Sequence, residues 1–331
     1  MARESWLARE ETRTLHGMEE SKTAVTAALL GNAALAVLKG TTAVLTGSAA
    51  MLAETFHSIA DTGNQILLFL GMRLASRPPD EAHPFGFGKN VYFWSFVVSM
   101  MLFTLGGAFS IWEAVRHYLH PVEKTPAVWA YGVLAGSFVF ESISLSVALH
   151  GLKRNAGARS IRQYWEDSRD PTLVTVLMED GTALVALLVA AGGLWLTQTT
   201  GDGIWDAAAS GLIGLMLIVV AIVLAMESHS LLIGERAPAW VERTIRGVVS
   251  SEPAVTRLAE LHTMHLGPRA VLIVLGVTFA GHLTAGEVGE AVAQLQRRLG
   301  ERLGDLTNER LIVIEPTPAP ALRHPEPSRL G

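Results

Sequence analysis

Residues 205–226 read WDAAASGLIGLMLIVVAIVLAM, and the only charged side chain among them is Asp206. An α-helix rises about 1.5 Å per residue and the hydrocarbon core of a bilayer is roughly 30 Å thick, so about 20 apolar residues can cross it. This stretch is therefore expected to form a transmembrane helix, and the chain to be an integral membrane protein.

Five earlier stretches of the chain have a similar length and composition. The predicted spans run from Ala24 to Leu45, Ser48 to Leu74, Tyr92 to Tyr118, Ala127 to Leu152, Thr172 to Leu196 and Trp205 to Met226. The whole composition agrees, because 50% of the 331 residues are apolar and only 17% are charged, against roughly 25% charged residues in a typical soluble protein. The sequence thus predicts an α-helical membrane protein with six transmembrane helices.

The basic residues of the loops predict the orientation, because cytoplasmic loops carry an excess of Lys and Arg. The loops after the second and fourth predicted helices contain Arg73, Arg77, Lys89, Lys153, Arg154, Arg159, Arg162 and Arg169, whereas the opposite loops offer little beyond Lys124. Both termini are therefore predicted to be cytoplasmic. Residues 1–22 are charged and lack the apolar core of a signal peptide, so they are expected to be a cytoplasmic segment.

The pattern changes to that of a soluble domain after residue 233. Helix patterns cover Trp240 to Ser250 and Ala285 to Leu299, and strand patterns cover Leu258 to Leu266, Ala270 to Ala280 and Arg310 to Glu315. This helix–strand–strand–helix–strand order predicts a small ferredoxin-like α+β domain. The expected domains are 1–22, the membrane domain 23–233, the cytoplasmic domain 234–315 and a disordered, Pro-rich tail 316–331.

Several classes of function are not expected from this sequence. The net charge is −5 with no large basic face, so nucleic acid is not an expected partner. The absence of cysteine excludes disulfides and thiolate metal sites. Neither a P-loop nor a nucleophile elbow is recognisable, so the chain is expected to bind no nucleotide and not to be an enzyme.

Ionisable residues interrupt the predicted spans, and such residues are costly in a membrane and usually functional. His57 and Asp61 are four residues apart, so an imidazole and a carboxylate share one face of a helix. Glu179 and Asp180 are adjacent and diverge by about 100° around their helix, so one of them is expected to line a site. Glu141 is a third acidic position. For His57 and Asp61 the alternative is a packing hydrogen bond, and for Glu141 it is a buried hydrogen bond or a helix end.

Histidine nitrogen together with carboxylate oxygen suits Zn²⁺, Co²⁺, Fe²⁺ or Mn²⁺, of which zinc is the commonest in such sites. Ligation needs neutral His57 and ionised Asp61, so metal and protons compete for the same groups. A membrane site with this property can exchange a metal ion for protons. Lys39 is expected to snorkel or to form an ion pair and not to be a ligand.

The residues at this point resemble the cation diffusion facilitator family, over about residues 22–315. The resemblance rests on the motifs Thr46-Gly47-Ser48 through Asp61, Asp80-Glu81-Ala82-His83-Pro84 through Lys89, and Leu231-Leu232-Ile233-Gly234-Glu235. It implies a homodimer in the lipid bilayer and metal/proton antiport by alternating access. The metal is then the transported substrate and protons are the counter-ion, with no tightly bound cofactor.

The family's transport site, carried over to this chain, falls on His57, Asp61, Val176 and Asp180. Val176 cannot bind a metal, which leaves the fourth ligand open among Glu179, Glu141 and water. The stretch from Asp170 to Gly181, with Glu141, resembles the branch that includes an animal mitochondrial zinc transporter. An oxygen-rich ligand set favours zinc less and leaves Mn²⁺ or Fe²⁺ open.

The accessory metal sites of the family are incomplete in this sequence. Asp80 and His83 stand where some relatives bind a second zinc ion, but Phe87 replaces a histidine, and the alternative for His83 is a turn-stabilising role. The positions of the soluble-domain site are identified as Ala259, Leu275 and Ile314, which cannot be ligands. The soluble domain is therefore expected mainly to hold the dimer together.

The leading hypothesis is a proton-coupled exporter of a divalent transition metal. Its site would contain His57, Asp61 and Asp180 with Glu179 or Glu141. The alternative is a non-transporting membrane scaffold or regulator that keeps the fold, which is favoured by Val176. The high content of Ala and Arg with little Lys indicates a GC-rich bacterial genome, and hence a bacterial inner membrane.

Overall fold

A computed structural model describes residues 29–120, 128–156, 171–268, 270–306 and 311–318. The predictions for residues 1–22, for Arg159, Arg162 and Arg169, and for the tail from residue 319 on lie outside these ranges. The chain divides into two units: one contains the long helices, and the other contains the C-terminal residues with the loop from Leu74 to Asn90. The predicted domain limits, which leave that loop in the membrane domain, remain a prediction.

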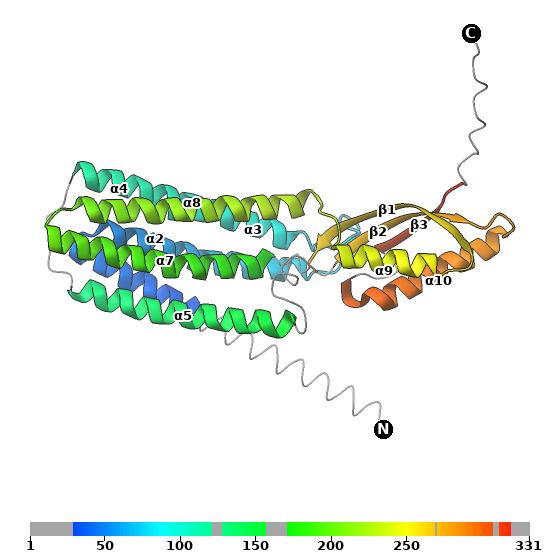
Figure 1. Ribbon diagram of the computed structural model, residues 1–331, viewed down its shortest axis with the longest axis horizontal. Helices are drawn as coiled ribbons and strands as arrows, with labels where there is room; N and C mark the ends of the chain where they lie inside the picture. Colours follow the sequence, from blue (N-terminus) through cyan, green and yellow to red (C-terminus); the bar gives the residue numbers. More distant parts are fainter. Residues whose placement is uncertain (1–28, 121–127, 157–170, 269, 307–310, 319–331) are drawn as a thin grey trace, which may run out of the picture. The chain divides into compact units, whose positions relative to one another are not determined.

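The helical unit is a bundle of long helices that run side by side (Figure 1). The helices are Leu29–Thr46, α2 (Ala49–Ala75), α3 (Asn90–Met101), the π-helix η1 (Leu102–Ala108), α4 (Phe109–Leu119), α5 (Val128–Ala156), α7 (Pro171–Thr200) and α8 (Ile204–Ile233). Since α3, η1 and α4 are continuous, they together occupy the third predicted span. The bounds of the long helices lie close to those expected from the apolar runs.

Within the described residues, five helices are long and apolar enough to cross a membrane, and α2 is not among them. Helix α2 is 27 residues long, but buried polar residues interrupt its apolar sequence. These residues include Glu54, His57, Asp61 and Asn64. The chain is thus a helical membrane protein, and the long helix of its bundle that is not apolar enough by this criterion carries two of the predicted ligands, His57 and Asp61.

The π-helix η1 packs closely against α8 through glycine. A side chain added at Gly107 would overlap Ile218 and would lie 3.1 Å from the carbonyl oxygen of Gly214. A side chain added at Gly214 would in turn lie 2.8 Å from the carbonyl oxygen of Gly107. The two backbones can approach only because both positions lack a Cβ atom.

Gly107→Ala is therefore expected to destabilise the protein by about 1–3 kcal/mol, the usual cost of overpacking. The measurement is the thermal unfolding midpoint of the detergent-solubilised protein. Gly136→Ala on α5 is the matched control, because no atom lies within 4 Å of the added Cβ. Equal midpoints for the two variants would show that the contact between η1 and α8 is not tight.

A buried carboxylate joins the beginning of α2 to the beginning of α8. Asp206 of α8 accepts hydrogen bonds of 2.6 Å from the hydroxyl of Ser48 and from the backbone N–H of Ala49. His117 of α4 lies 3.7 Å from the same carboxylate. The Ser48 hydroxyl also accepts from the N–H of Met51, as a helix N-cap residue does. The first turn of α2 is therefore attached to α8.

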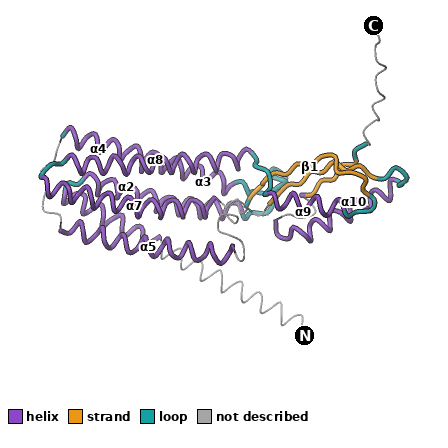
Figure 2. The backbone as a smooth tube through the Cα atoms, in the orientation of Figure 1, coloured by secondary structure: helices purple, strands orange, loops and turns teal. Residues whose placement is uncertain are grey.

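The C-terminal unit has the predicted order of helices and strands, α9 (Ala239–Ser250), β1 (Val255–Gly267), β2 (Ala270–Phe279), α10 (Ala285–Leu303), η2 (Gly304–Leu306) and β3 (Ile312–Pro316). Strand β2 is central, antiparallel to β1 and parallel to β3. Apolar residues of both helices and the three strands form one core. Figure 2 shows the change from helices to strands along the chain.

Candidate functional site

His57 and Asp61 lie inside the helical unit, one turn apart on α2. His57 is 0% exposed, and its Nδ1 atom lies 3.6 Å from Oδ1 of Asp61, too far for a good hydrogen bond. Both ring nitrogens of His57 and the Oδ1 atom of Asp61 are buried without a hydrogen-bond partner among the described residues. A buried histidine with two unsatisfied nitrogens needs an explanation, and a bound ion is one of the few available.

The two acidic residues of α7 point to different helices. The Glu179 carboxylate accepts a short hydrogen bond from the side-chain amide of Asn64 on α2. The Asp180 carboxylate accepts a hydrogen bond of 2.8 Å from the hydroxyl of Ser144 on α5. This divergence is expected for adjacent helical residues. Glu179 faces the helix of His57, while Asp180 faces α5.

The charges of these residues nevertheless act on one another. Asp61 interacts electrostatically with Asp180 and with Glu179, although the three carboxylates belong to two helices. Glu141 of α5 is 6% exposed and interacts with Asp61 and Asp180. The charges of four acidic side chains on α2, α5 and α7 therefore act on one another inside the bundle. Val176, one turn before Asp180, is partly buried and supplies no donor atom.

The acidic side chains are gathered but do not converge on one point. Within the described residues, no group of three His, Asp or Glu side chains is close enough to hold one metal ion. A metal ligand set would need side-chain rotations in α2, α5 or α7. The assignment of the individual ligands therefore remains a prediction.

Two residues of this region were not among the predicted site residues. Asn64 and Ser144 support the carboxylates of Glu179 and Asp180. A signal existed in the sequence, because Asn64 follows Asp61 by three positions and Ser144 follows Glu141 by three, so each lies on the same helix face as an acidic residue. Residues that hold a metal ligand in place are part of a metal site.

Lys39 forms an ion pair and does not snorkel. Its ammonium group lies 3.0 Å from Glu54 of α2, and both side chains are fully buried. Of the two expected alternatives the ion pair is confirmed, and snorkelling is wrong because the bundle encloses the whole side chain.

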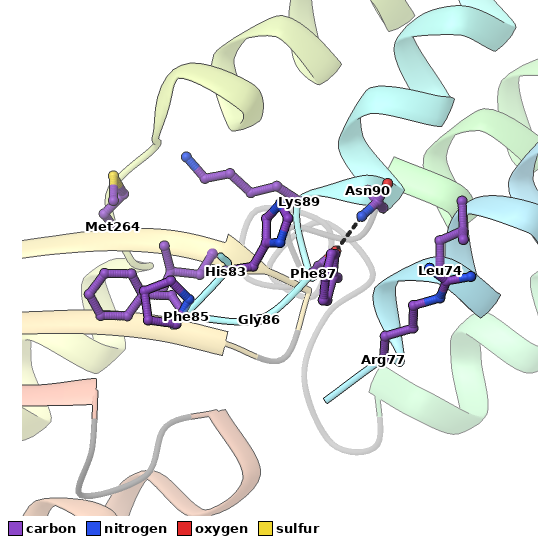
Figure 3. A pocket seen from close by; sticks show the side chains of 11 residues that line it. Leu74, Arg77, His83, Phe85, Gly86, Phe87, Lys89, Asn90 and Met264 are labelled. Atoms are coloured by element: carbon purple, nitrogen blue, oxygen red, sulfur yellow. Dashed lines mark hydrogen bonds between the residues drawn. The ribbon is translucent and has the colours of Figure 1, made fainter. Parts of the chain in front are cut away.

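The loop between α2 and α3 belongs to the C-terminal unit and lines a cavity of about 570 Å³ with Met264 and Leu266. Figure 3 shows the side chains of this loop, with the amide of Asn90 bonded to the Phe87 carbonyl. Asp80 accepts from the backbone N–H of His83, and its carboxylate also lies 3.1 Å from the His83 ring. The ring in turn lies against Phe87, 4.3 Å away.

Desolvation tends to raise the pKa of Asp80, but the hydrogen bonds from His83 outweigh it and lower the pKa. Asp80 and His83 therefore stabilise the turn together, the alternative considered for His83. As metal ligands they would form an incomplete set, since Phe87 stands where a third ligand would be needed. The loop metal site remains a prediction.

Two of the three positions identified for a soluble-domain metal site, Leu275 and Ile314, lie in the core of the C-terminal unit, while Ala259 is exposed. Leu275 of β2 and Ile314 of β3 pair directly in the sheet and are buried in the core of the C-terminal unit. Their side chains fill space that ligands would need. That the soluble domain mainly holds the dimer together remains a prediction.

A helical bundle of membrane-spanning length that buries histidine and carboxylates together is suited to binding cations. The family described as "Cation efflux transmembrane domain" matches residues 25–233. The chain belongs to this family, the cation diffusion facilitators, and is a multi-pass membrane protein.

Individual relatives agree with this assignment. The proton-coupled zinc antiporter SLC30A9, mitochondrial, of Xenopus laevis is 36% identical over 234 residues, which are 70% of this chain and 42% of that protein. The human protein of the same name is 33% identical over 70% of this chain and 41% of its own length. Metal tolerance protein C4 of Arabidopsis thaliana is 31% identical over 80% of this chain and 58% of its own length. The chain thus spans about half or less of these relatives.

Proposed function

We propose that this transporter exports a divalent transition metal, with zinc as the first candidate, in exchange for protons. The observation that carries the proposal is His57, which is fully buried and has no partner for either ring nitrogen among the described residues. It lies one turn from Asp61, whose charge interacts with acidic residues of α5 and α7. In this proposal His57, Asp61 and Asp180 bind the ion, and Glu179 or Glu141 completes the ligand set.

The chemistry of the donors limits the substrate. One imidazole with several carboxylates suits Zn²⁺, Co²⁺, Fe²⁺ and Mn²⁺. Zinc takes precedence because similar proteins are named zinc antiporters. The excess of carboxylates over histidine keeps Mn²⁺ and Fe²⁺ as candidates, because these ions accept oxygen ligands readily.

Proton coupling follows from the ligands themselves. A metal ion binds neutral imidazole and ionised carboxylate, so each protonation of His57 or Asp61 removes a ligand. Protons that enter the site from one side of the membrane would displace the metal toward that side. Alternating exposure of the site to the two sides of the membrane then exchanges metal for protons.

The remaining features of the proposal concern the arrangement in the membrane. Helix α2 also crosses the membrane, which brings the number of transmembrane helices to six. Its polar residues face the interior of the bundle. Both termini lie in the cytoplasm, and the ferredoxin-like C-terminal domain contributes to a homodimer. A bacterial inner membrane is the proposed location, on the ground of composition; the named animal relatives are mitochondrial.

The second candidate function is a membrane scaffold that has lost transport. It is favoured by Val176, which removes one donor, and by the lack of a closed three-residue ligand group within the described helices. Against it, Glu179 and Asp180 remain buried acidic residues, and carboxylates in a membrane are costly to keep without a use.

Reconstituted liposomes separate the two candidates. Metal-driven proton flux is measured with Zn²⁺, Mn²⁺, Fe²⁺ and Co²⁺ for the wild type, for Asp180→Ala and for Glu290→Ala, an exposed acidic control on α10. We expect flux with at least one metal, a loss of at least about tenfold in Asp180→Ala, and no change in the control. Wild-type protein without flux for any metal would favour the scaffold.

A further inference from the structure

Lys39 is unusual in the part of the helical unit that the structure describes. No other Lys or Arg is buried there, and its side chain is 0% exposed. A buried charge in a membrane protein is costly and marks function unless its partners explain it fully. The partners of Lys39 therefore indicate what the charge does.

The ammonium group is held against the same face of α2 that carries the predicted ligands. Its Nζ atom donates to Oε2 of Glu54 at 3.0 Å and to the hydroxyl of Ser58 at 2.8 Å. Residues 54, 57, 58 and 61 are spaced by three or four, so they form one stripe along the helix. The other carboxylate oxygen of Glu54, Oε1, is buried without a hydrogen-bond partner among the described residues. The ion pair is thus one turn from His57.

The charge of Lys39 reaches the transport site despite its pairing with Glu54. It acts on His57, Asp61 and Glu141, which belong to α2 and α5. The ammonium group reaches Ser58, which is one turn from Asp61, whereas Glu54 is two turns from Asp61. Asp61 is therefore nearer to the positive end of the pair than to its negative end.

A resident positive charge has opposite effects on the two states of the site. When the metal is absent, the ammonium group offsets the repulsion among Asp61, Glu141, Glu179 and Asp180. When a divalent ion is bound, the same group repels it. Both effects lower the affinity for the metal, and a transporter must bind its ion weakly enough to release it.

We propose that Lys39, fixed by Glu54 and Ser58, is an internal counter-cation that sets the metal affinity of the transport site. It is a positioning residue and not a ligand. The inference rests on the proposed function, since it assigns to Lys39 a role in binding the transported metal.

The test measures Zn²⁺ binding to the full-length, detergent-solubilised protein by calorimetry. We expect Lys39→Met to bind zinc about tenfold more tightly, because a nearby repulsive charge is removed. Glu54→Gln should bind about tenfold more weakly, because a nearby attractive charge is removed and Lys39 is left unopposed. The double variant Lys39→Met/Glu54→Gln should return to within about threefold of the wild type. Lys153→Met, an exposed lysine of α5, is the control and should not change zinc binding.

A single variant that leaves one charge unpaired can fail to fold, because an uncompensated buried charge costs about 3–5 kcal/mol. The exchange variant Lys39→Glu/Glu54→Lys avoids this problem, since it keeps the ion pair and moves the cation onto α2. It should bind zinc about tenfold more tightly than the wild type, because the negative end of the pair is then the one nearer to Asp61. A pair that only joins two helices would leave the dissociation constant unchanged.

The outcomes distinguish this inference from the proposed function. Zinc binding by the wild type, with equal dissociation constants in the folded variants, would overturn the role of Lys39 and leave the transporter proposal standing. Absence of Zn²⁺ binding by the wild-type protein would overturn zinc as the substrate. It would also overturn the proposed role of Lys39 in zinc binding.

Discussion

Asp61→Asn is expected to abolish zinc-driven proton flux in reconstituted liposomes. The amide has nearly the shape of the carboxylate, so the packing of α2 should survive, but it carries no charge and is a poor ligand for Zn²⁺. It also cannot exchange a proton with the incoming metal. We expect a loss of more than about 100-fold, beyond the range of about 10- to 100-fold typical of residues that only support a ligand.

Two measurements accompany this experiment. Size-exclusion chromatography checks that the variant keeps the oligomeric state of the wild type, so that lost flux is not lost folding. Asp202→Asn serves as the matched control, because Asp202 is an exposed carboxylate of the helical unit that only caps α8. Full flux in Asp61→Asn would contradict the placement of Asp61 in the transport site.

Glu179→Gln is expected to weaken zinc binding more than Glu141→Gln does. Both residues are candidates for the ligand that Val176 does not provide, and both are 6% exposed. Glu179, however, already contacts α2 through Asn64, one turn beyond Asp61. Its carboxylate also interacts with the charge of Asp61, so we expect a loss of at least about tenfold, in the range seen for residues of a metal site.

Zinc binding of the two glutamine variants is measured by calorimetry under identical conditions. The comparison is matched, since the same chemical change is made at two equally buried positions on neighbouring helices. A larger loss in Glu141→Gln would assign the fourth ligand to Glu141 of α5. Equal binding in both variants and the wild type would point to water as the fourth ligand.

Much of the fold is predictable from the apolar pattern, because long apolar runs in this chain have one stable solution, the helix. The apolar pattern alone describes α2 least well. This helix has a low apolar content because Glu54, His57 and Asn64 are buried inside the bundle. The π-helix at Leu102–Ala108 was not predicted. It coincides with the close packing of Gly107 on α8, a tertiary contact that no local pattern reports.

For the candidate site, the sequence supplies the spacing but not the partners. The positions of His57 and Asp61 on one helix face follow from their separation by four residues. Which of Glu179 and Asp180 faces α2 depends on the rotation of α7 in the bundle, and the structure settles this through the hydrogen bond from Asn64. The partner of Lys39 likewise depends on which helix lies beside it, so two alternatives were open from sequence alone.

The attachment of Ser48 and Ala49 to Asp206 makes α2 a lever with one fixed end. Arg73 is 24 residues from Ala49, so about 36 Å of helix separates it from that end. A tilt of about 10° about the attached turn would displace the helix by about 6 Å at Arg73 but by only about 3 Å at Asp61. Such a lever would let a large opening at one membrane surface accompany a small, easily reversed change in the distances between the proposed ligands.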